Sequence, residues 1–157
     1  MNIKKSVIDI IGKTPIMRAS RFEKAMEIND ACVLVKLECM NPAGSSKDRA
    51  ALYMIEDAEK RGLLSTGGVI VEATSGNTGV GLALVAQAKG YKARIYLPEN
   101  MRGDKSEAMK NYGAEVVFTT ATQLIGVCMK ASIKYPKVRF LNCSIHQSYA
   151  SLRTYYG

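Results

Sequence analysis

Short runs of β-branched and apolar residues alternate with longer helical stretches from residue 33 onward. Five runs have this character: Val33–Leu37, Val69–Glu72, Ala93–Leu97, Glu115–Phe118 and Val138–Leu141. Their nearly continuous hydrophobicity is typical of parallel strands that are covered on both faces. The repeated strand–helix–strand order predicts right-handed crossovers, so the expected fold is α/β: a parallel sheet with helices on both faces.

Four helical segments separate or follow these runs, and each has a stop signal. The expected helices run from about Ser46 to Arg61, Asn77 to Lys89, Asp104 to Tyr112 and Thr122 to Lys134. The residues that end them are Gly62, Gly90, Gly113 and Pro136. Glycine adopts the left-handed conformation that closes a helix, and proline cannot continue one.

The N-terminal stretch does not fit this alternation. Residues 8–16 form a short apolar piece turned by Gly12 and Pro15, and residues 22–28 are compatible with a helix. Neither has an obvious strand partner in the alternation that follows. We therefore expect residues 1–40, which include the first predicted strand, to pack on a second domain.

Charge and hydropathy narrow the classes of function. The chain of 157 residues has 22 Lys and Arg against 14 Asp and Glu, a formal net charge of +8. An excess of basic residues can indicate nucleic-acid binding. Here the basic residues are scattered along the chain and are not interleaved with aromatic ones. We therefore expect them to be solvated surface charges, and we expect no nucleic-acid partner. No segment approaches the ~20 apolar residues of a membrane span, and the first residues lack a signal-peptide pattern. The expected location is the cytoplasm.

The cysteines and the single histidine show no metal-site pattern. The four cysteines are Cys32, Cys39, Cys128 and Cys143, without a C-x-x-C spacing, and His146 alone cannot complete a zinc set with them. We expect buried, reduced thiols. A surface histidine, and not a general base, is the favoured interpretation of His146.

Two loops contain the residues from which chemistry is expected. In an open parallel sheet, ligands bind at the carboxyl ends of the strands, where loops lead into helices. Residues 41–49, Asn-Pro-Ala-Gly-Ser-Ser-Lys-Asp-Arg, join the first predicted strand to the first long helix. Residues 74–81, Thr-Ser-Gly-Asn-Thr-Gly-Val-Gly, directly follow the second predicted strand.

The second of these loops is dense in groups that recognise an anion. Its glycines allow a ligand to approach the backbone, and the free N–H groups of a helix start favour negative charge. Further donors come from the side chains of Thr74, Ser75, Asn77 and Thr78. A tight turn with a capping side chain is the alternative interpretation. The spacing differs from G-x-G-x-x-G, so a dinucleotide site is not indicated.

Lys47 lies in the first turn of a predicted helix. A cation is disfavoured there by the helix dipole. A Schiff-base lysine has to be neutral and nucleophilic, and a field that disfavours the ammonium serves this purpose. Considered alone, Lys47 could be an ordinary surface lysine, and its position is what favours a functional role.

Together the two loops resemble those of the fold-type II pyridoxal-phosphate enzymes, and among these the cysteine synthase and cystathionine β-synthase family. Residues 11–16, Ile-Gly-Lys-Thr-Pro-Ile, resemble the opening segment of that family. Residues 41–49 match its cofactor-lysine loop and residues 74–79 its asparagine loop. The resemblance is continuous from about residue 6 to residue 141, which is the N-terminal half of a family member.

The resemblance implies a role for each matching residue. Lys47 would bind pyridoxal 5'-phosphate covalently and later move the α-proton of the substrate. Asn77 would hydrogen-bond the 3-oxygen of the cofactor. The α-carboxylate of the amino acid would be bound by Thr74, Ser75 and Thr78. The implied reaction is a β-replacement, in which an O-activated serine such as O-acetylserine loses its leaving group and sulfide or a thiol adds. A homodimer is the implied assembly.

The sequence departs from the family pattern near its C-terminus. Family members place a carboxylate-binding glutamine just after the last strand, whereas residues 141–147 here read Leu-Asn-Cys-Ser-Ile-His-Gln. Gln147 could substitute only if the loop is shifted. The chain stops at Gly157, before the family's glycine- and threonine-rich phosphate loop. We therefore expect residues 41–141 to form a small α/β domain, residues 142–157 to begin a large domain, and the 157-residue chain to be incomplete alone.

Two other interpretations stay open at this stage. One is a truncated, non-catalytic homologue or a binding module that keeps the fold. The other is a different fold-type II activity, such as that of cystathionine β-synthase or threonine dehydratase. The second substrate is recognised partly by residues that this sequence does not contain, so the loops alone do not separate these activities.

Overall fold

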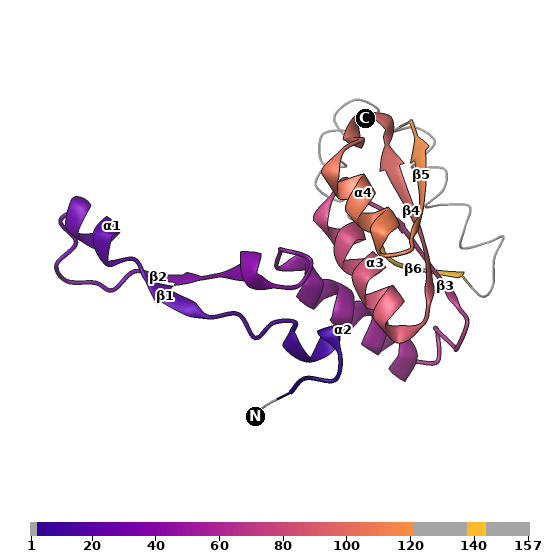
Figure 1. Ribbon diagram of the computed structural model, residues 1–157, viewed down its shortest axis with the longest axis horizontal. Coiled ribbons are helices and arrows are strands. Elements are labelled where there is room, and N and C mark those ends of the chain that lie inside the picture. The colour runs from indigo at the N-terminus through magenta and orange to yellow at the C-terminus, as the bar shows by residue number, and fades with distance from the viewer. Residues whose placement is uncertain (1–2, 121–137, 144–157) are drawn as a thin grey trace, which may run out of the picture.

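The computed structural model describes residues 3–120 and 138–143 of the chain. They form a compact α/β unit and an N-terminal arm that extends away from it (Figure 1).

A parallel sheet is the centre of the α/β unit. Its four strands are β3 (Val69–Ala73), β4 (Lys92–Pro98), β5 (Glu115–Thr119) and β6 (Val138–Cys143), in the spatial order β5-β4-β3-β6. All three neighbouring pairs are parallel. The carboxyl ends of the strands therefore lie at one edge of the sheet, which we call the carboxyl edge.

Helices flank this sheet and begin at the carboxyl edge. They are α2 (Lys47–Lys60), α3 (Asn77–Lys89) and α4 (Asp104–Asn111). α3 connects β3 to β4 and α4 connects β4 to β5. Two contacts show that α2 runs parallel to α3. The Lys47 carbonyl lies against Gly81 near the start of both helices, and Lys89 Nζ donates to the Glu59 carboxylate at 2.7 Å near their ends. All three helices thus start at the same edge.

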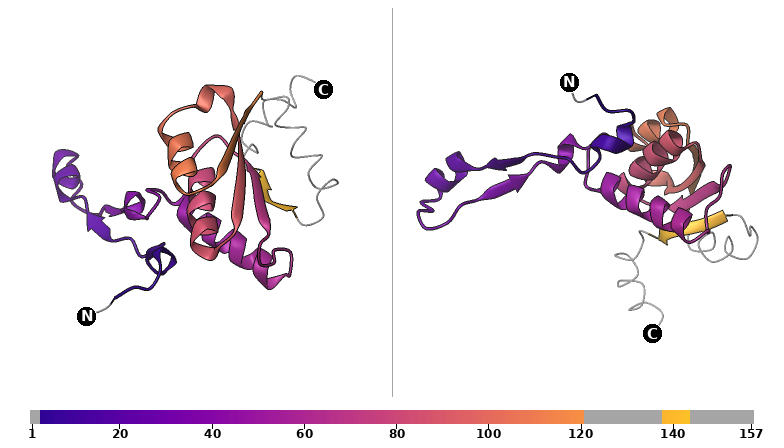
Figure 2. Two further views of the ribbon diagram at one scale, coloured as in Figure 1. Left: turned by 45° about the vertical axis from the view of Figure 1, so that its right-hand side comes forward. Right: turned by 90° about the horizontal axis from the view of Figure 1, so that it is seen from below.

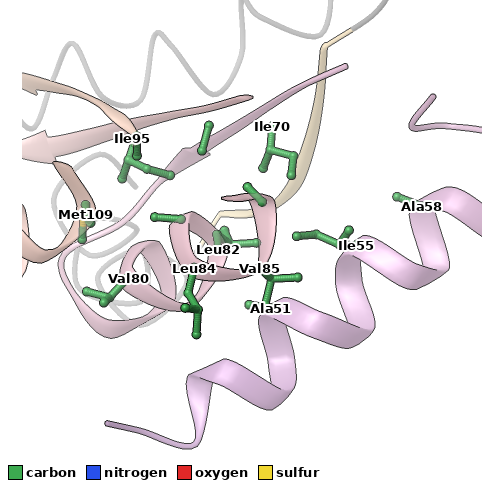
Figure 3. Packing of buried hydrophobic residues seen from close by; sticks show 14 of the residues in the cluster. Ala51, Ile55, Ala58, Ile70, Val80, Leu82, Leu84, Val85, Ile95 and Met109 are labelled. Carbon is green, nitrogen blue, oxygen red and sulfur yellow. The ribbon is translucent and has the colours of Figure 1, made fainter. Parts of the chain in front are cut away.

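The hydrophobic core lies between α2, α3 and the sheet (Figure 3). Ile55 of α2, Leu82 of α3 and Ile95 of β4 are each 0% exposed. Every residue of α3 from Thr78 to Ala86 is buried. A helix that is apolar on all sides has to be enclosed on all sides, and α3 is enclosed by α2, α4 and the sheet.

The arm consists of residues 13–37 and projects from the α/β unit (Figure 2). It contains the strands β1 (Ile16–Arg18) and β2 (Leu34–Lys36), which pair in antiparallel fashion, and the short helix α1 (Ser20–Ala25) between them. All six strand residues are exposed. Several large apolar side chains of the arm are more than half exposed, namely Ile16, Met17, Phe22, Met26 and Leu34. A two-stranded hairpin with this much apolar surface is marginal in water by itself.

The predicted α/β fold with a parallel sheet is confirmed. Four predicted strands form the sheet. Of the predicted helices, Asn77–Lys89 forms with the expected bounds, and two others end within one residue of them. The glycines that follow them have the expected positive φ, 65° at Gly62, 77° at Gly90 and 78° at Gly113. The predicted helix from Thr122 to Lys134 lies outside the described residues.

Two predictions are wrong. The run Val33–Leu37 does form a strand, β2, but it pairs antiparallel with β1 in the arm and not with the parallel sheet. Apolar character predicts a strand and does not select its partner, which depends on residues far along the chain. The cysteines Cys32 and Cys39 were expected to be buried and are exposed, because they lie on and next to the arm.

Candidate functional site

Lys47 is the first residue of α2 and its side chain is exposed at the carboxyl edge. Its amide N–H donates to Ser45 Oγ at 3.2 Å, which holds the first turn of the helix. A Cβ built on Gly81 would lie 3.0 Å from the Lys47 carbonyl oxygen and 3.2 Å from Ala51 Cβ. Glycine at position 81 therefore permits the close approach of α2 to α3. Gly81 is one helical turn, about 6 Å, beyond Asn77, so the Lys47 backbone lies about one helical turn from Asn77.

Residues 74–79, the asparagine loop, connect β3 to α3 at the same edge. The side chains of Ser75 and Asn77 are exposed, whereas Thr74 and Thr78 are 1% and 8% exposed. Thr74 Oγ1 accepts the Gly76 N–H at 3.2 Å, and the Gly76 carbonyl accepts the Gly79 N–H at 3.0 Å. These bonds fix the turn.

Gly79 packs the asparagine loop tightly onto the α/β unit. A Cβ at this position would lie 2.6 Å from Thr74 Cγ2, 2.8 Å from Met109 Cε and 3.0 Å from Ile95 Cγ2. These atoms belong to the loop itself, to α4 and to β4. The start of α3 is thus held without free space between three parts of the core, which makes the loop a rigid support for Asn77.

A polar network at the base of the arm joins it to α2, and we call this network the Glu38 clasp. Arg49 donates from Nε to Glu38 Oε2 at 3.0 Å and from Nη2 to Oε1 at 2.9 Å. Glu38 also accepts from Thr14 Oγ1 at 3.1 Å and from Asn41 Nδ2 at 2.8 Å. Bidentate Arg–carboxylate bonds are among the stronger polar contacts in proteins. The clasp therefore ties both strands of the arm, through residues 14 and 38, to a point two residues after Lys47.

The clasp has an expected acid dependence. The Arg49 guanidinium, with Asn41 and Thr14, stabilises ionised Glu38 and lowers its pKa from 4.5 to about 2. The folded state thus binds fewer protons at Glu38 than the unfolded state does. The resulting stabilisation is complete above pH 4.5 and is lost as the pH falls toward 2.

Glu38→Gln should remove this acid dependence, because glutamine does not titrate. We expect the urea midpoint of the wild-type protein to fall more steeply than that of the variant between pH 5 and pH 2.5. Glu107→Gln is the matched control, since Glu107 is an exposed carboxylate that pairs with Lys110. It should leave the wild-type pH dependence in place. Parallel curves for the wild-type and Glu38→Gln proteins would contradict the assignment.

Asp48 closes the loop that presents Lys47. It is 0% exposed, and its Oδ2 accepts the Ala43 N–H at 2.6 Å. Burial raises the pKa of this carboxyl group. Its Oδ1 has no hydrogen-bond partner among the described residues. The bond between the Asp48 carboxylate and the Ala43 N–H thus closes residues 43–48 directly before α2.

The structure brings the two predicted loops together at one edge. Lys47, Ser75 and Asn77 are accessible there, whereas Thr74 and Thr78 are buried. His146 and Gln147 lie outside the described residues.

Sequence reasoning gave no role to Arg49, Glu38 or Lys105, which also lie at or near this edge. Arg49 belongs to the lysine loop, so its position was visible, but its partner Glu38 was not. Within residues 3–120 and 138–143, no group of three or more His, Cys, Asp or Glu residues is arranged to hold a metal ion, and no helix is long and apolar enough to span a bilayer.

Comparison with known proteins gives consistent matches. Residues 7–142 match the family described as pyridoxal-phosphate dependent enzyme. The chain is 47% identical over 137 residues to a probable cysteine synthase of Bacillus subtilis. The aligned residues cover 87% of this chain and 42% of that protein. It is 49% identical over 113 residues to cysteine synthase B of Salmonella typhimurium, covering 72% of this chain and 36% of that protein.

Two solved structures have the same fold over the same region. A hydrogen sulfide-producing enzyme of Fusobacterium nucleatum superposes with a TM-score of 0.76 at 38% identity, covering 90% of this chain and 46% of that chain. O-ureido-L-serine synthase superposes with a TM-score of 0.78 at 35% identity, covering 88% of this chain and 44% of that chain. The sequence therefore spans less than half the length of these proteins.

Proposed function

The chain belongs to the pyridoxal-phosphate dependent enzyme family, and from this premise we propose that its protein makes cysteine from an O-activated serine, such as O-acetylserine, and sulfide. The observation that carries the proposal is the juxtaposition of Lys47 with the asparagine loop at the carboxyl edge. The similarity to cysteine synthases at 47–49% identity supports this choice of reaction within the family.

The residues at the carboxyl edge fit pyridoxal 5'-phosphate. The cofactor requires a lysine amine that its aldehyde can reach, and Lys47 is exposed at the start of α2. It also requires a polar group held beside its ring, and Asn77 is exposed on the loop that Gly79 holds rigidly. When bound, the cofactor supplies an electron sink that stabilises negative charge at the α-carbon of an amino acid.

The roles of the chain's own residues follow from this arrangement. We assign to Lys47 the attachment of the cofactor and the movement of the α-proton through its Nζ atom. We assign to Asn77 the orientation of the ring. Thr74, Ser75 and Thr78, with the N–H groups at the start of α3, bind the α-carboxylate. Overall, acetate leaves the β-carbon and sulfide takes its place.

The organisation of the whole protein is part of the proposal. We propose that residues 1–40 pack on a large domain, that residues 41–141 form the small domain, and that residues 142–157 lead into the large one. The exposed apolar side chains of the arm support the first assignment. A homodimer in the cytoplasm, without nucleic-acid or membrane partners, completes the proposal.

Substitutions in the asparagine loop test the site. Asn77→Ala should weaken cofactor retention, and Thr78→Ala should mainly raise KM for the amino acid. A lost hydrogen bond to a charged group changes affinity by roughly ten- to a hundred-fold. The measurements are the visible absorbance after dialysis and the steady-state kinetics of sulfide-dependent cysteine formation from O-acetylserine. Gln87→Ala, on an exposed face of the same helix, is the control. Unchanged constants in both loop variants would mean that the loop is only a turn.

The substrate assignment has its own test. The wild-type protein should form cysteine from O-acetylserine and sulfide faster than it forms cystathionine from serine and homocysteine or 2-oxobutyrate from threonine. A preference for either of the last two reactions would overturn the assignment of cysteine synthesis while leaving the site intact.

A further inference from the structure

The ammonium group of Lys105 lies over the asparagine loop. Lys105 is in the first turn of α4, and its side chain crosses to Gly76. A Cβ built on Gly76 would lie 3.1 Å from Lys105 Nζ and 3.5 Å from its Cδ. Gly76 separates Ser75 from Asn77, so the ammonium group lies beside the middle residue of this part of the loop, on a side chain that is exposed to solvent.

The exposed ammonium group of Lys105 adds to the positive charge at the start of α3. The start of α3 presents unpaired N–H groups and the positive end of the helix dipole. Among the described residues Lys105 forms no ion pair, whereas Lys110 on the same helix pairs with Glu107 at 2.7 Å. An anion bound at the turn would interact favourably with both the ammonium group and the helix start.

We propose that Lys105 supplies the positive counter-charge for the α-carboxylate of the amino-acid substrate. This inference rests on the proposed function and adds a charged residue to that site. The hydroxyl groups of the asparagine loop are neutral donors. A carboxylate that leaves water needs charged or multiple hydrogen-bond partners to offset its lost hydration. The flexible stem and three donors of a lysine suit this task.

Lys105 is then a specificity-determining residue. It favours amino acids with a free α-carboxylate over amides and esters, which carry no charge at that position. Its removal should weaken the binding of the carboxylate without affecting the attachment of the cofactor, because Lys47 and Asn77 are left in place.

The test uses the protein loaded with pyridoxal 5'-phosphate and two probes that have no leaving group, L-alanine and L-alaninamide. Calorimetry should give a Kd for L-alanine that is about tenfold higher in Lys105→Met than in the wild type, the effect of losing one charge-assisted hydrogen bond. The Kd for L-alaninamide should not change. Lys105→Arg should restore most of the affinity for L-alanine.

Lys110→Met is the matched control, because it removes a lysine from the same helix that already has a partner. It should bind L-alanine as the wild type does. Equal L-alanine affinity in Lys105→Met and wild type would overturn the inference, as would a loaded wild-type protein that does not bind L-alanine. Failure of the proposed function is seen separately, as the absence of cofactor absorbance in the wild type before any probe is added.

Discussion

Lys47→Ala is expected to abolish covalent binding of pyridoxal 5'-phosphate and, with it, cysteine formation. The reason is positional. Lys47 is exposed at the start of α2, and the Gly81 contact places it beside the turn that carries Asn77. Alanine at position 47 removes the side-chain amine to which the cofactor would be attached. The measurement is the visible absorbance after dialysis, followed by borohydride reduction and peptide mapping of the modified lysine.

Lys60→Ala is the control for this prediction. Lys60 ends the same helix and is exposed, but it lies at the opposite end from the carboxyl edge. This variant should retain full absorbance and activity. The assignment fails if the cofactor in Lys47→Ala is still trapped on another lysine, and Lys105 is the one whose modification would be the most informative, because it lies at the same edge.

Gly79→Val is expected to lower the free energy of unfolding by about 3 kcal/mol, the upper part of the usual range for overpacked cores. Its Cβ would meet Thr74, Met109 and Ile95 at 2.6, 2.8 and 3.0 Å. Met109 and Ile95 are each 0% exposed, so neither can move toward solvent. Gly79→Ala should have a smaller effect, because alanine adds the Cβ atom without the two Cγ atoms of valine and is a better helix former than glycine.

Urea unfolding of both variants measures these effects. Ala88→Val is the matched control, because it places the same β-branched residue on an exposed position of α3 and should cost only about 0.5 kcal/mol of helix propensity. A Gly79→Val protein as stable as this control would show that the start of α3 has room to adjust. Loss of cofactor retention in Gly79→Ala would further show that the support of Asn77 has shifted.

Much of the fold could be predicted from local sequence signals. The strands β3 and β4 are mostly apolar runs, and the glycines at 62, 90 and 113 mark helix ends by their conformational freedom. These signals depend on residues that are close together in the chain, so they can be recognised in a single sequence. The partner of β2 could not be predicted in this way. Its pairing with β1 joins residues about twenty positions apart, and both strands are exposed, so no periodic pattern distinguishes this pairing from a place in the sheet.

The site was partly predictable for a similar reason. Lys47, Asn77 and their neighbours lie in two loops whose composition is unusual, and their convergence follows from a parallel sheet with helices that begin at one edge. The partners of these residues were not predictable. Lys105 approaches Gly76 from a different helix, and Glu38 binds Arg49 from the base of the arm. Such contacts depend on how helices and strands pack in space, and they produce no recognisable motif in the sequence.

The close packing of α2 on α3 restricts how this site can move. The Lys47 backbone rests against Gly81, and Glu59 bonds Lys89 at the far end of the same two helices. Close-packed elements shift together because there is no free volume between them. Lys47 and Asn77 therefore belong to one rigid body, and opening or closing of the site cannot separate them. Within residues 3–120 the chain leaves this body toward the arm at residues 11–14 and 37–41, so a hinge between the body and the arm would lie in the segments that the Glu38 clasp holds.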